Sequence, residues 1–183
     1  MRPPKVPEPA ELIAAVEMLS QRLREASTTI TTVESCTGGL VGASITAMPG
    51  SSDIYPGGFI TYSNALKHTM VGVLDDTLGT HGAVSPQTAI EMARGGQHAA
   101  QADYALAITG IAGPGGETET KPVGTVWICA SGPNSWLDCR RFRFPGDRGQ
   151  VRHQSCLTAL LMADQAIDQA TQTLPHEQER FGA

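Results

Sequence analysis

Residues 29–39 of the chain read TITTVESCTGG, and this stretch decides the fold class. The β-branched run from Thr29 to Val33 favours a strand ending at Glu34, because branched side chains have few rotamers beside a helical turn. After the two glycines, apolar residues recur at the spacing of a helix packed on a sheet, at Leu40, Val41, Ala43 and Ile45. A strand followed at once by a helix is a building unit of α/β domains.

Further helices and strands are expected on both sides of this unit. The alternation of helices with strands, and two late strands in succession, predict a three-layer α/β/α sandwich with a mixed sheet of about five strands. The expected helices include residues 12–23, 64–71, 85–98 and 149–171, and the expected later strands are residues 58–62, 104–108, 124–130 and 141–144.

The length of 183 residues suits one domain with its own hydrophobic core. Residues 1–9 contain four prolines and are expected to form a flexible arm. The domain is expected to span residues 10–174, and the polar residues 175–183 a flexible tail.

Composition narrows the classes of function. The net charge of −5 gives no general attraction to nucleic acid or to anionic membranes, so neither is expected as a partner. No apolar run reaches membrane-spanning length, and no signal peptide is evident, so the expected location is the cytoplasm. The four cysteines form no C-x-x-C pair, so we expect free thiols and no metal site.

Polar residues follow three of the expected strands, at Glu34–Gly39, Tyr62–Asn64 and Thr109–Gly110. Ligands of α/β proteins bind beyond the carboxyl ends of the strands, so these segments predict the site. The start of the helix after Gly39 would offer backbone amides and a helix dipole to an anionic ligand.

Each candidate residue also has a simpler structural interpretation. Ser35 and Thr37 are common helix-capping residues, and a buried Glu34 needs only a salt bridge or hydrogen bonds. Lys67 could be a solvated surface lysine, but a desolvated Lys67 could act as a general base toward a serine, with Ser35, Ser51 and Ser52 as candidate partners. His81, in an expected turn, is interpreted as structural.

The glycine-rich stretch 110–116 fits neither a dinucleotide-binding motif nor a P-loop, and no cofactor is expected. It could be a wall over the ligand or simply a long connection. One of the arginines in the only basic cluster could bind a phosphate; the cluster comprises Arg140, Arg141, Arg143, Arg148 and Arg152.

Five motifs in order make the chain resemble the CinA C-terminal domain family over roughly residues 12–165. The motifs are ESCTGG at 34–39, GGFITYSN at 57–64 with Lys67, HGAVS at 81–85, TGIAGPGG at 109–116 and KPVGTVW at 121–127. The resemblance implies an α/β/α fold with a five-stranded mixed sheet, no metal and a homo-oligomer. It also implies a nicotinamide-nucleotide amidase, which converts nicotinamide mononucleotide to nicotinic acid mononucleotide and ammonia.

The family resemblance implies a serine–lysine mechanism with Ser52 as nucleophile, Lys67 as base and Tyr62 nearby. Ser35 stays open as an alternative nucleophile or as a ligand of the substrate phosphate. The expected substrate-binding residues are Glu34, Ser35, Thr37, Gly38, Asn64, Thr109, Gly110 and Arg148.

Two other functions stay open at this point. One is a non-catalytic interaction module associated with competence and DNA damage, which would release no ammonia from nicotinamide mononucleotide. The other is an amidase for a different nucleotide-like substrate, because the motifs report the reaction site better than the distal pocket.

Overall fold

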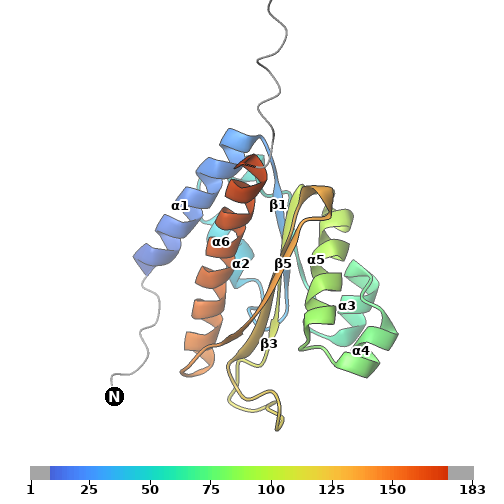
Figure 1. The fold of residues 1–183 in the computed structure, drawn as a ribbon. Helices are drawn as coiled ribbons and strands as arrows, with labels where there is room; N and C mark the ends of the chain where they lie inside the picture. Colours follow the sequence, from blue (N-terminus) through green and yellow to red (C-terminus); the bar gives the residue numbers. More distant parts are fainter. Residues whose placement is uncertain (1–8, 173–183) are drawn as a thin grey trace, which may run out of the picture.

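A mixed five-stranded sheet lies at the centre of the computed structural model, which describes residues 9–172 (Figure 1). The strand order is β2-β1-β3-β4-β5, in which β1 pairs in parallel with β2 and β3 while β4 is antiparallel to both of its neighbours. The strands are β1 (Ile30–Glu34), β2 (Gly58–Ile60), β3 (Tyr104–Gly110), β4 (Thr125–Ser131) and β5 (Leu137–Arg143).

Helices cover both faces of the sheet, as Figure 1 shows, and this confirms the predicted three-layer α/β/α fold. One face carries α1 (Pro9–Ala26), α2 (Leu40–Thr46) and α6 (Arg148–Gln172). The other carries α3 (Asn64–Val71), α4 (Asp75–His81) and α5 (Pro86–Ala100).

The sheet separates two apolar cores because successive side chains of a strand point to opposite faces. In β3, Leu106 and Ile108 pack under α1, α2 and α6, whereas Ala107 packs under α5. All five residues of β1 are buried, as expected for a strand covered on both faces.

Most expected elements are present, with three differences. Residues 75–81 form helix α4, so His81 ends a helix instead of lying in a turn, and its carbonyl accepts a hydrogen bond from Lys121 Nζ at 3.0 Å. Strand β2 stops at Ile60 instead of residue 62, and β5 begins at Leu137 instead of residue 141. Except for Pro9, which begins α1, the expected arm and tail lie outside the described residues.

The parallel pairing of β1 with β2 and β3 places three carboxyl ends at one edge of the sheet. Glu34 lies opposite Ile60 of β2 and Ile108 of β3, so the segments that follow these residues are neighbours. We call this edge, with residues 34–39, 61–67 and 109–113, the carboxyl edge.

Candidate active site

A buried lysine and a serine meet at the carboxyl edge. Lys67 is only 1% exposed, and its Nζ donates hydrogen bonds to Ser35 Oγ at 3.1 Å and to the carbonyl of Thr61 at 2.8 Å. The carbonyl of Tyr62 lies at 3.5 Å from the same nitrogen. Ser35 directly follows β1 and is 8% exposed, so it is the more accessible residue of the pair.

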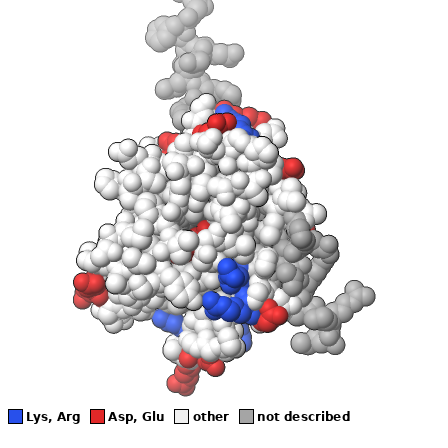
Figure 2. All heavy atoms as spheres, turned by 180° about the vertical axis from the view of Figure 1, so that it is seen from behind, with Lys and Arg blue, Asp and Glu red and all other residues white. Residues whose placement is uncertain are grey.

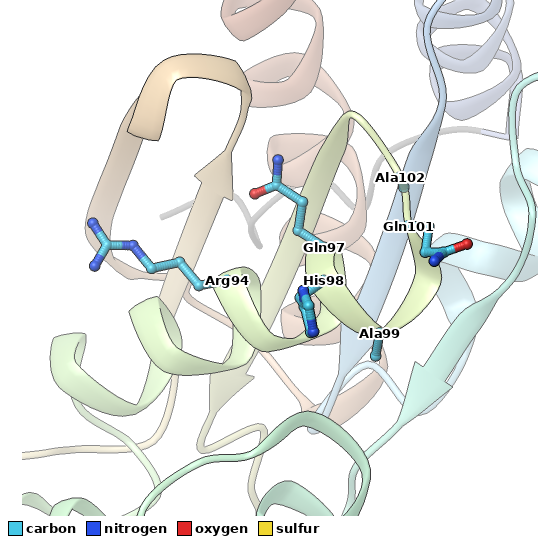
Figure 3. Close-up of a pocket in the computed structure, with 6 residues that line it drawn as sticks. All are labelled: Arg94, Gln97, His98, Ala99, Gln101 and Ala102. Carbon is cyan, nitrogen blue, oxygen red and sulfur yellow. The ribbon is translucent and has the colours of Figure 1, made fainter.

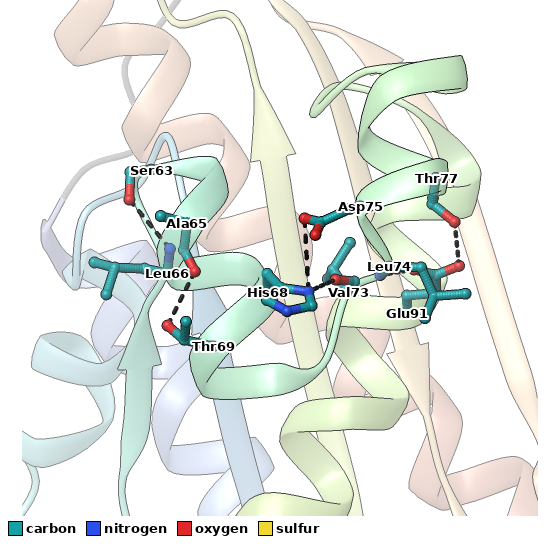
Figure 4. A network of polar contacts seen from close by, with 10 residues as sticks. All are labelled: Ser63, Ala65, Leu66, His68, Thr69, Val73, Leu74, Asp75, Thr77 and Glu91. Carbon is teal, nitrogen blue, oxygen red and sulfur yellow. Dashed lines mark hydrogen bonds and ion pairs between the residues drawn. The ribbon is translucent and has the colours of Figure 1, made fainter.

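Helix α3 holds Lys67 in this position, and both of its ends are fixed (Figure 4). At its start, Ser63 Oγ accepts a hydrogen bond from the backbone N–H of Leu66 at 3.2 Å, an N-cap that ties the first turn. After its end, the N–H of Leu74 donates to the Glu91 carboxylate of α5 at 2.9 Å. The lysine therefore comes from a helix anchored to its neighbour.

Burial changes the proton affinity of the groups at this edge. The pKa of Lys67 is lowered from 10.5 to about 8, mainly because burial disfavours the charged ammonium. Burial also raises the pKa of the neighbouring Cys36 thiol to about 12. A substantial fraction of Lys67 is thus neutral near pH 8, while Cys36 stays protonated and is a poor nucleophile.

Glu34 caps the helix that follows Ser35. Its carboxylate accepts hydrogen bonds from the backbone N–H groups of Gly39 at 2.9 Å, Val41 at 3.2 Å and Gly42 at 2.8 Å. These amides are the donors that a bound anion would need at the start of α2. The helix terminus predicted to bind an anion is therefore occupied by the protein's own carboxylate.

Two arginines from the first turns of α6 reach the same edge. Arg152 donates two hydrogen bonds to the carbonyl of Thr37, at 2.7 and 3.2 Å, and so holds the turn after Ser35. Arg148 donates to the carbonyl of Gly113 at 2.9 Å and to the hydroxyl of Tyr62 at 3.1 Å. The sequence placed both arginines in the basic cluster but selected only Arg148 for the site, although their i, i+4 spacing puts both on one helix face.

The structure does not bring Ser52 and Lys67, the predicted catalytic pair, together within the described chain. Ser52 is exposed in the short 3₁₀ helix Ser51–Asp53, and the next residue, Ile54, accepts a hydrogen bond from the N–H of Ile30 at the start of β1. Lys67 lies beyond the other end of β1, which at about 3.3 Å per residue puts the two side chains on the order of 15 Å apart. Ser35, the alternative nucleophile, is the serine that contacts Lys67.

The remaining predicted site residues, which lie near the ends of β2 and β3, differ in their exposure and in their contacts. The Tyr62 ring is 58% exposed and its hydroxyl contacts Arg148, while Asn64 begins α3 with an exposed side chain. The buried hydroxyl of Thr109 donates to the carbonyl of Ala83 at 2.7 Å, which is a structural bond. At Gly110 an added Cβ would lie 2.7–2.9 Å from atoms of β4, so this glycine permits close strand packing.

In the turn after β1, the predicted residue Thr37 is buried and the predicted residue Gly38 is exposed. Thr37 has no exposed surface, and its hydroxyl has no hydrogen-bond partner among the described residues. Gly38 has a φ of 61°, a left-handed conformation that glycine adopts without strain, and its N–H donates to the carbonyl of Ser35 at 3.1 Å. Both residues shape the turn that presents Ser35.

Basic side chains and one open depression lie at different places on the surface. On the face in Figure 2, Lys and Arg side chains gather toward the lower end, the end where α6 begins in Figure 1. An open depression of about 580 Å³ lies at the other edge of the sheet, beside the end of α5, lined by Arg94, Gln97, His98, Ala99, Gln101 and Ala102 (Figure 3). None of the predicted site residues lines it.

Within residues 9–172 there is no group of three or more His, Cys, Asp or Glu side chains arranged to hold a metal ion. In the same part of the chain, no helix combines the length and the apolar character needed to cross a membrane.

The fold and the buried pair define an α/β/α domain that presents a serine with a desolvated lysine at the carboxyl ends of parallel strands. The sequence model of the CinA C-terminal domain matches residues 13–167. The chain therefore belongs to the CinA C-terminal domain family.

Similar proteins agree with this membership. Nicotinamide-nucleotide amidohydrolase PncC of Escherichia coli K12 is 48% identical over 151 residues, which cover 82% of this chain and 92% of that protein. A CinA-like protein of Leptospira biflexa is 45% identical over 139 residues, which make up 33% of its length. The crystal structure of competence/damage inducible protein CihA from Agrobacterium tumefaciens has a TM-score of 0.84 at 36% identity, covering 90% of this chain and 99% of that one.

Proposed function

We propose that this chain hydrolyses the carboxamide of nicotinamide mononucleotide to nicotinic acid mononucleotide and ammonia, with Ser35 as nucleophile and Lys67 as its base. The observation that carries the proposal is the 3.1 Å contact between Lys67 Nζ and Ser35 Oγ in a site where Lys67 is 1% exposed. The 48% identity to PncC, a protein named for this reaction, supports the choice of substrate. Such an enzyme returns nicotinamide mononucleotide to pyridine-nucleotide synthesis.

The contacts of Lys67 suit a general base. A neutral amine has two N–H donors and one lone pair, and the carbonyls of Thr61 and Tyr62 can accept from the two N–H groups. The lone pair is then left to face Ser35 Oγ and to accept its proton. These carbonyls therefore orient the amine as well as satisfy its donors.

The proposed reaction has two chemical steps. In the first, Lys67 takes the Ser35 proton, Oγ forms a bond to the carboxamide carbon, and ammonia leaves with the proton that Lys67 returns. In the second, water attacks the acyl-enzyme ester after giving a proton to Lys67, and that proton returns to Ser35 as the carboxylic acid leaves. The sum is amide plus water giving acid plus ammonia.

We assign the substrate phosphate to Arg148. The backbone amides at the start of α2 already bind the Glu34 carboxylate, so they are not available to a phosphate. The Arg148 guanidinium is exposed and contacts only neutral groups in the described structure, the carbonyl of Gly113 and the hydroxyl of Tyr62. A phosphate is a stronger partner for a guanidinium than either of these.

Ammonia release from nicotinamide mononucleotide by three alanine variants tests the catalytic pair. We expect Ser35→Ala and Lys67→Ala to lower kcat by about 10³-fold or more, because each removes a partner of the proton transfer. Ser52→Ala is the matched serine control and should stay within about threefold of the parent, since Ser52 lies at the other edge of the sheet. Activity retained by Ser35→Ala and lost in Ser52→Ala would refute the assignment.

The substrate range separates the proposed function from its rivals. We expect ammonia from nicotinamide mononucleotide and much less from nicotinamide or its riboside, and Arg148→Ala should raise KM for the mononucleotide with a smaller change in kcat. Equal activity on the three compounds would contradict the phosphate assignment. No ammonia from any of them would favour the non-catalytic module.

The assembly and location of the protein are also proposals. The family resemblance implies a homo-oligomer, and a net charge of −5 is compatible with a cytoplasmic enzyme of small nucleotides. Light scattering coupled to size-exclusion chromatography should give a mass of at least twice the 19.3 kDa of one chain. A mass of one chain would contradict this expectation.

A further inference from the structure

Two cysteines that lie ten residues apart in the sequence face each other across the sheet. Cys129 of β4 and Cys139 of β5 are direct partners in the antiparallel register, and both are free thiols. Neither takes part in the site at the carboxyl edge. Their pairing comes from the β4–β5 hairpin and is independent of the proposed function.

The hydrogen-bond pattern of the hairpin identifies the kind of pair they form. At its loop, the N–H of Gly132 donates to the carbonyl of its partner Trp136, which makes Gly132–Trp136 a hydrogen-bonded pair. The two kinds of pair alternate along an antiparallel ladder, and the cysteines are three pairs further on. They therefore form a non-hydrogen-bonded pair.

The hydrogen bonds at the other end of the hairpin also make Cys129 and Cys139 a non-hydrogen-bonded pair. The N–H of Phe144 donates to the carbonyl of Gly124, five pairs away from the cysteines. Non-hydrogen-bonded partners have Cα atoms about 4.5 Å apart, against about 5.5 Å in the other kind. A separation of about 4.5 Å lies within the range of 4.4–6.8 Å found for disulfides.

The two thiols differ in accessibility and in acidity. Cys129 is fully buried, whereas Cys139 is partly exposed on β5, an edge strand of the sheet. The interaction between the two neighbouring thiols lowers the pKa of Cys139 and raises that of Cys129. Cys139 is thus the thiol that solvent reaches and the one that ionises first, and a thiolate is the form that reacts with oxidants.

We propose that Cys129 and Cys139 form a redox-active dithiol that a hydroperoxide converts to a cross-strand disulfide. With hydrogen peroxide, the Cys139 thiolate attacks one peroxide oxygen and becomes a sulfenic acid, and the released hydroxide takes up a proton to give water. The Cys129 sulfur then attacks the Cys139 sulfur, loses its proton and expels the sulfenic oxygen as a second water. Two thiols and one peroxide therefore give one disulfide and two waters.

The disulfide would fasten an edge strand to the sheet. Strand β5 has no neighbour on its outer side in the described chain, and the bond would close the loop from residue 129 to residue 139. The Cys139 Sγ also donates to the carbonyl of Pro86 at 3.9 Å, so α5 lies against the reacting sulfur. Reduction of the bond would restore the two thiols of the present structure.

Peptide mapping after peroxide treatment tests the proposal on the full native chain. Cleavage on the amino side of aspartate places the four cysteines in four different peptides, namely residues 1–52, 103–137, 138–146 and 147–163. The reduced protein is treated with hydrogen peroxide, the remaining thiols are alkylated in denaturant, and the protein is digested. We expect peptides 103–137 and 138–146 to be joined, with a mass two hydrogens below their sum, and to separate on treatment with dithiothreitol.

Two serine variants complete the test. Cys139→Ser should abolish the joined product, and Cys156→Ser, the matched change at a buried cysteine of α6, should leave it unchanged. The proposal is overturned if both peptides are recovered separately with alkylated cysteines while methionines of the same sample are oxidised. A joined product linking Cys129 to Cys36 or to Cys156 would overturn it as well.

Discussion

Burial of Lys67 has a stability cost, and it also gives the side chain the proton affinity that its proposed chemical role requires. An ammonium removed from water loses hydration that a few carbonyl contacts replace only in part, so the neutral amine becomes more favourable. The pKa of about 8 reflects this balance. A catalytic base needs a pKa near the working pH, and burial brings lysine into that range.

The activity should therefore depend on pH through Lys67. Only the neutral amine can accept the Ser35 proton, so kcat/KM for amide hydrolysis should rise with pH and reach half of its maximum near pH 8. Lys67→Arg is the matched control, because it stays cationic and should be inactive at every pH. The measurement is the initial rate of ammonia release between pH 6 and pH 10, and a flat profile for the parent would contradict the role of Lys67.

Glu34 affects the site through the helix that it caps. Its two oxygens accept three backbone N–H groups of the first turn of α2, and it is 1% exposed. A carboxylate at this place also interacts favourably with the positive end of the helix dipole. The residue next to it is Ser35, so the cap fixes the turn that presents the proposed nucleophile.

Replacing Glu34 by Gln tests this role with almost no change in volume. The amide NH₂ would face backbone N–H donors, so we expect a loss of about 1–3 kcal/mol in the free energy of unfolding. A fall in kcat should accompany the loss, because Ser35 shares the turn. The exposed Glu25→Gln of α1 is the control and should change the stability by less than about 0.5 kcal/mol in urea denaturation. Equal stability of Glu34→Gln and the parent would exclude a capping role.

Both residues of the Ser35–Lys67 contact were named from sequence, but the preferred pair was Ser52 with Lys67, and these two do not lie together in the described chain. Ser35 and Lys67 both follow strand ends, and the parallel pairing of β1 with β2 brings those ends together. Ser52 lies in the short 3₁₀ helix that follows α2, and α2 starts at the carboxyl edge and runs back along the sheet. A residue after such a helix lies at the opposite edge, and this geometry outweighs the short sequence separation between Ser52 and Lys67.

At the scale of elements, the contact between α3 and α5 sets the position of the lysine. A Cβ built on Gly95 of α5 would lie 1.7 Å from the carbonyl oxygen of Val71, the last residue of α3. Only a residue without a side chain allows the two helices this close. Lys67 lies one turn before Val71, so the contact also determines how far Lys67 reaches toward Ser35.

Gly95→Ala should therefore push α3 away from α5. We expect a loss of about 1–3 kcal/mol in stability from overpacking and a fall in kcat larger than the change in KM. Gly79→Ala is the matched control, since Gly79 lies inside α4 and no atom lies within 4 Å of its added Cβ. That change should be neutral or stabilise the protein by up to about 1 kcal/mol in thermal unfolding. A Gly95→Ala variant as stable and active as the parent would show that the helix contact is not needed.

The elements missed or shortened by sequence reasoning have physical explanations. Helix α4 has only seven residues and contains Gly79, a weak helix former, although Asp75 and Asp76 in its first turn are a start signal. Strand β5 carries charged residues at Asp138, Arg140 and Arg141, as expected of a partly exposed edge strand. The first residues of β5 adopt a strand conformation because they pair with β4. This pairing is a tertiary contact, and the local sequence does not show it.

At the scale of the whole molecule, one sheet serves two cores. Alternate residues of β3 and β4 face opposite layers, so loss of either layer would expose apolar side chains of the same strands. We therefore propose that the described chain unfolds as one cooperative unit, as the predicted domain of residues 10–174 implies. The chain contains two tryptophans, and they report on different layers. Trp127 packs against the core under α5, and Trp136 packs against the core under α1 and α6.

Two single-tryptophan variants test this cooperativity. Trp127→Phe leaves Trp136 as the reporter of one layer, and Trp136→Phe leaves Trp127 as the reporter of the other. In each variant, the urea midpoint from fluorescence should coincide with the midpoint of the same variant from far-UV circular dichroism, because a two-state transition gives one midpoint for every probe. A fluorescence transition that precedes the loss of helix in only one variant would show that its layer unfolds separately. The one-domain interpretation would then be wrong. The carboxyl edge contains residues from both layers, so its residues would separate before the sheet unfolds.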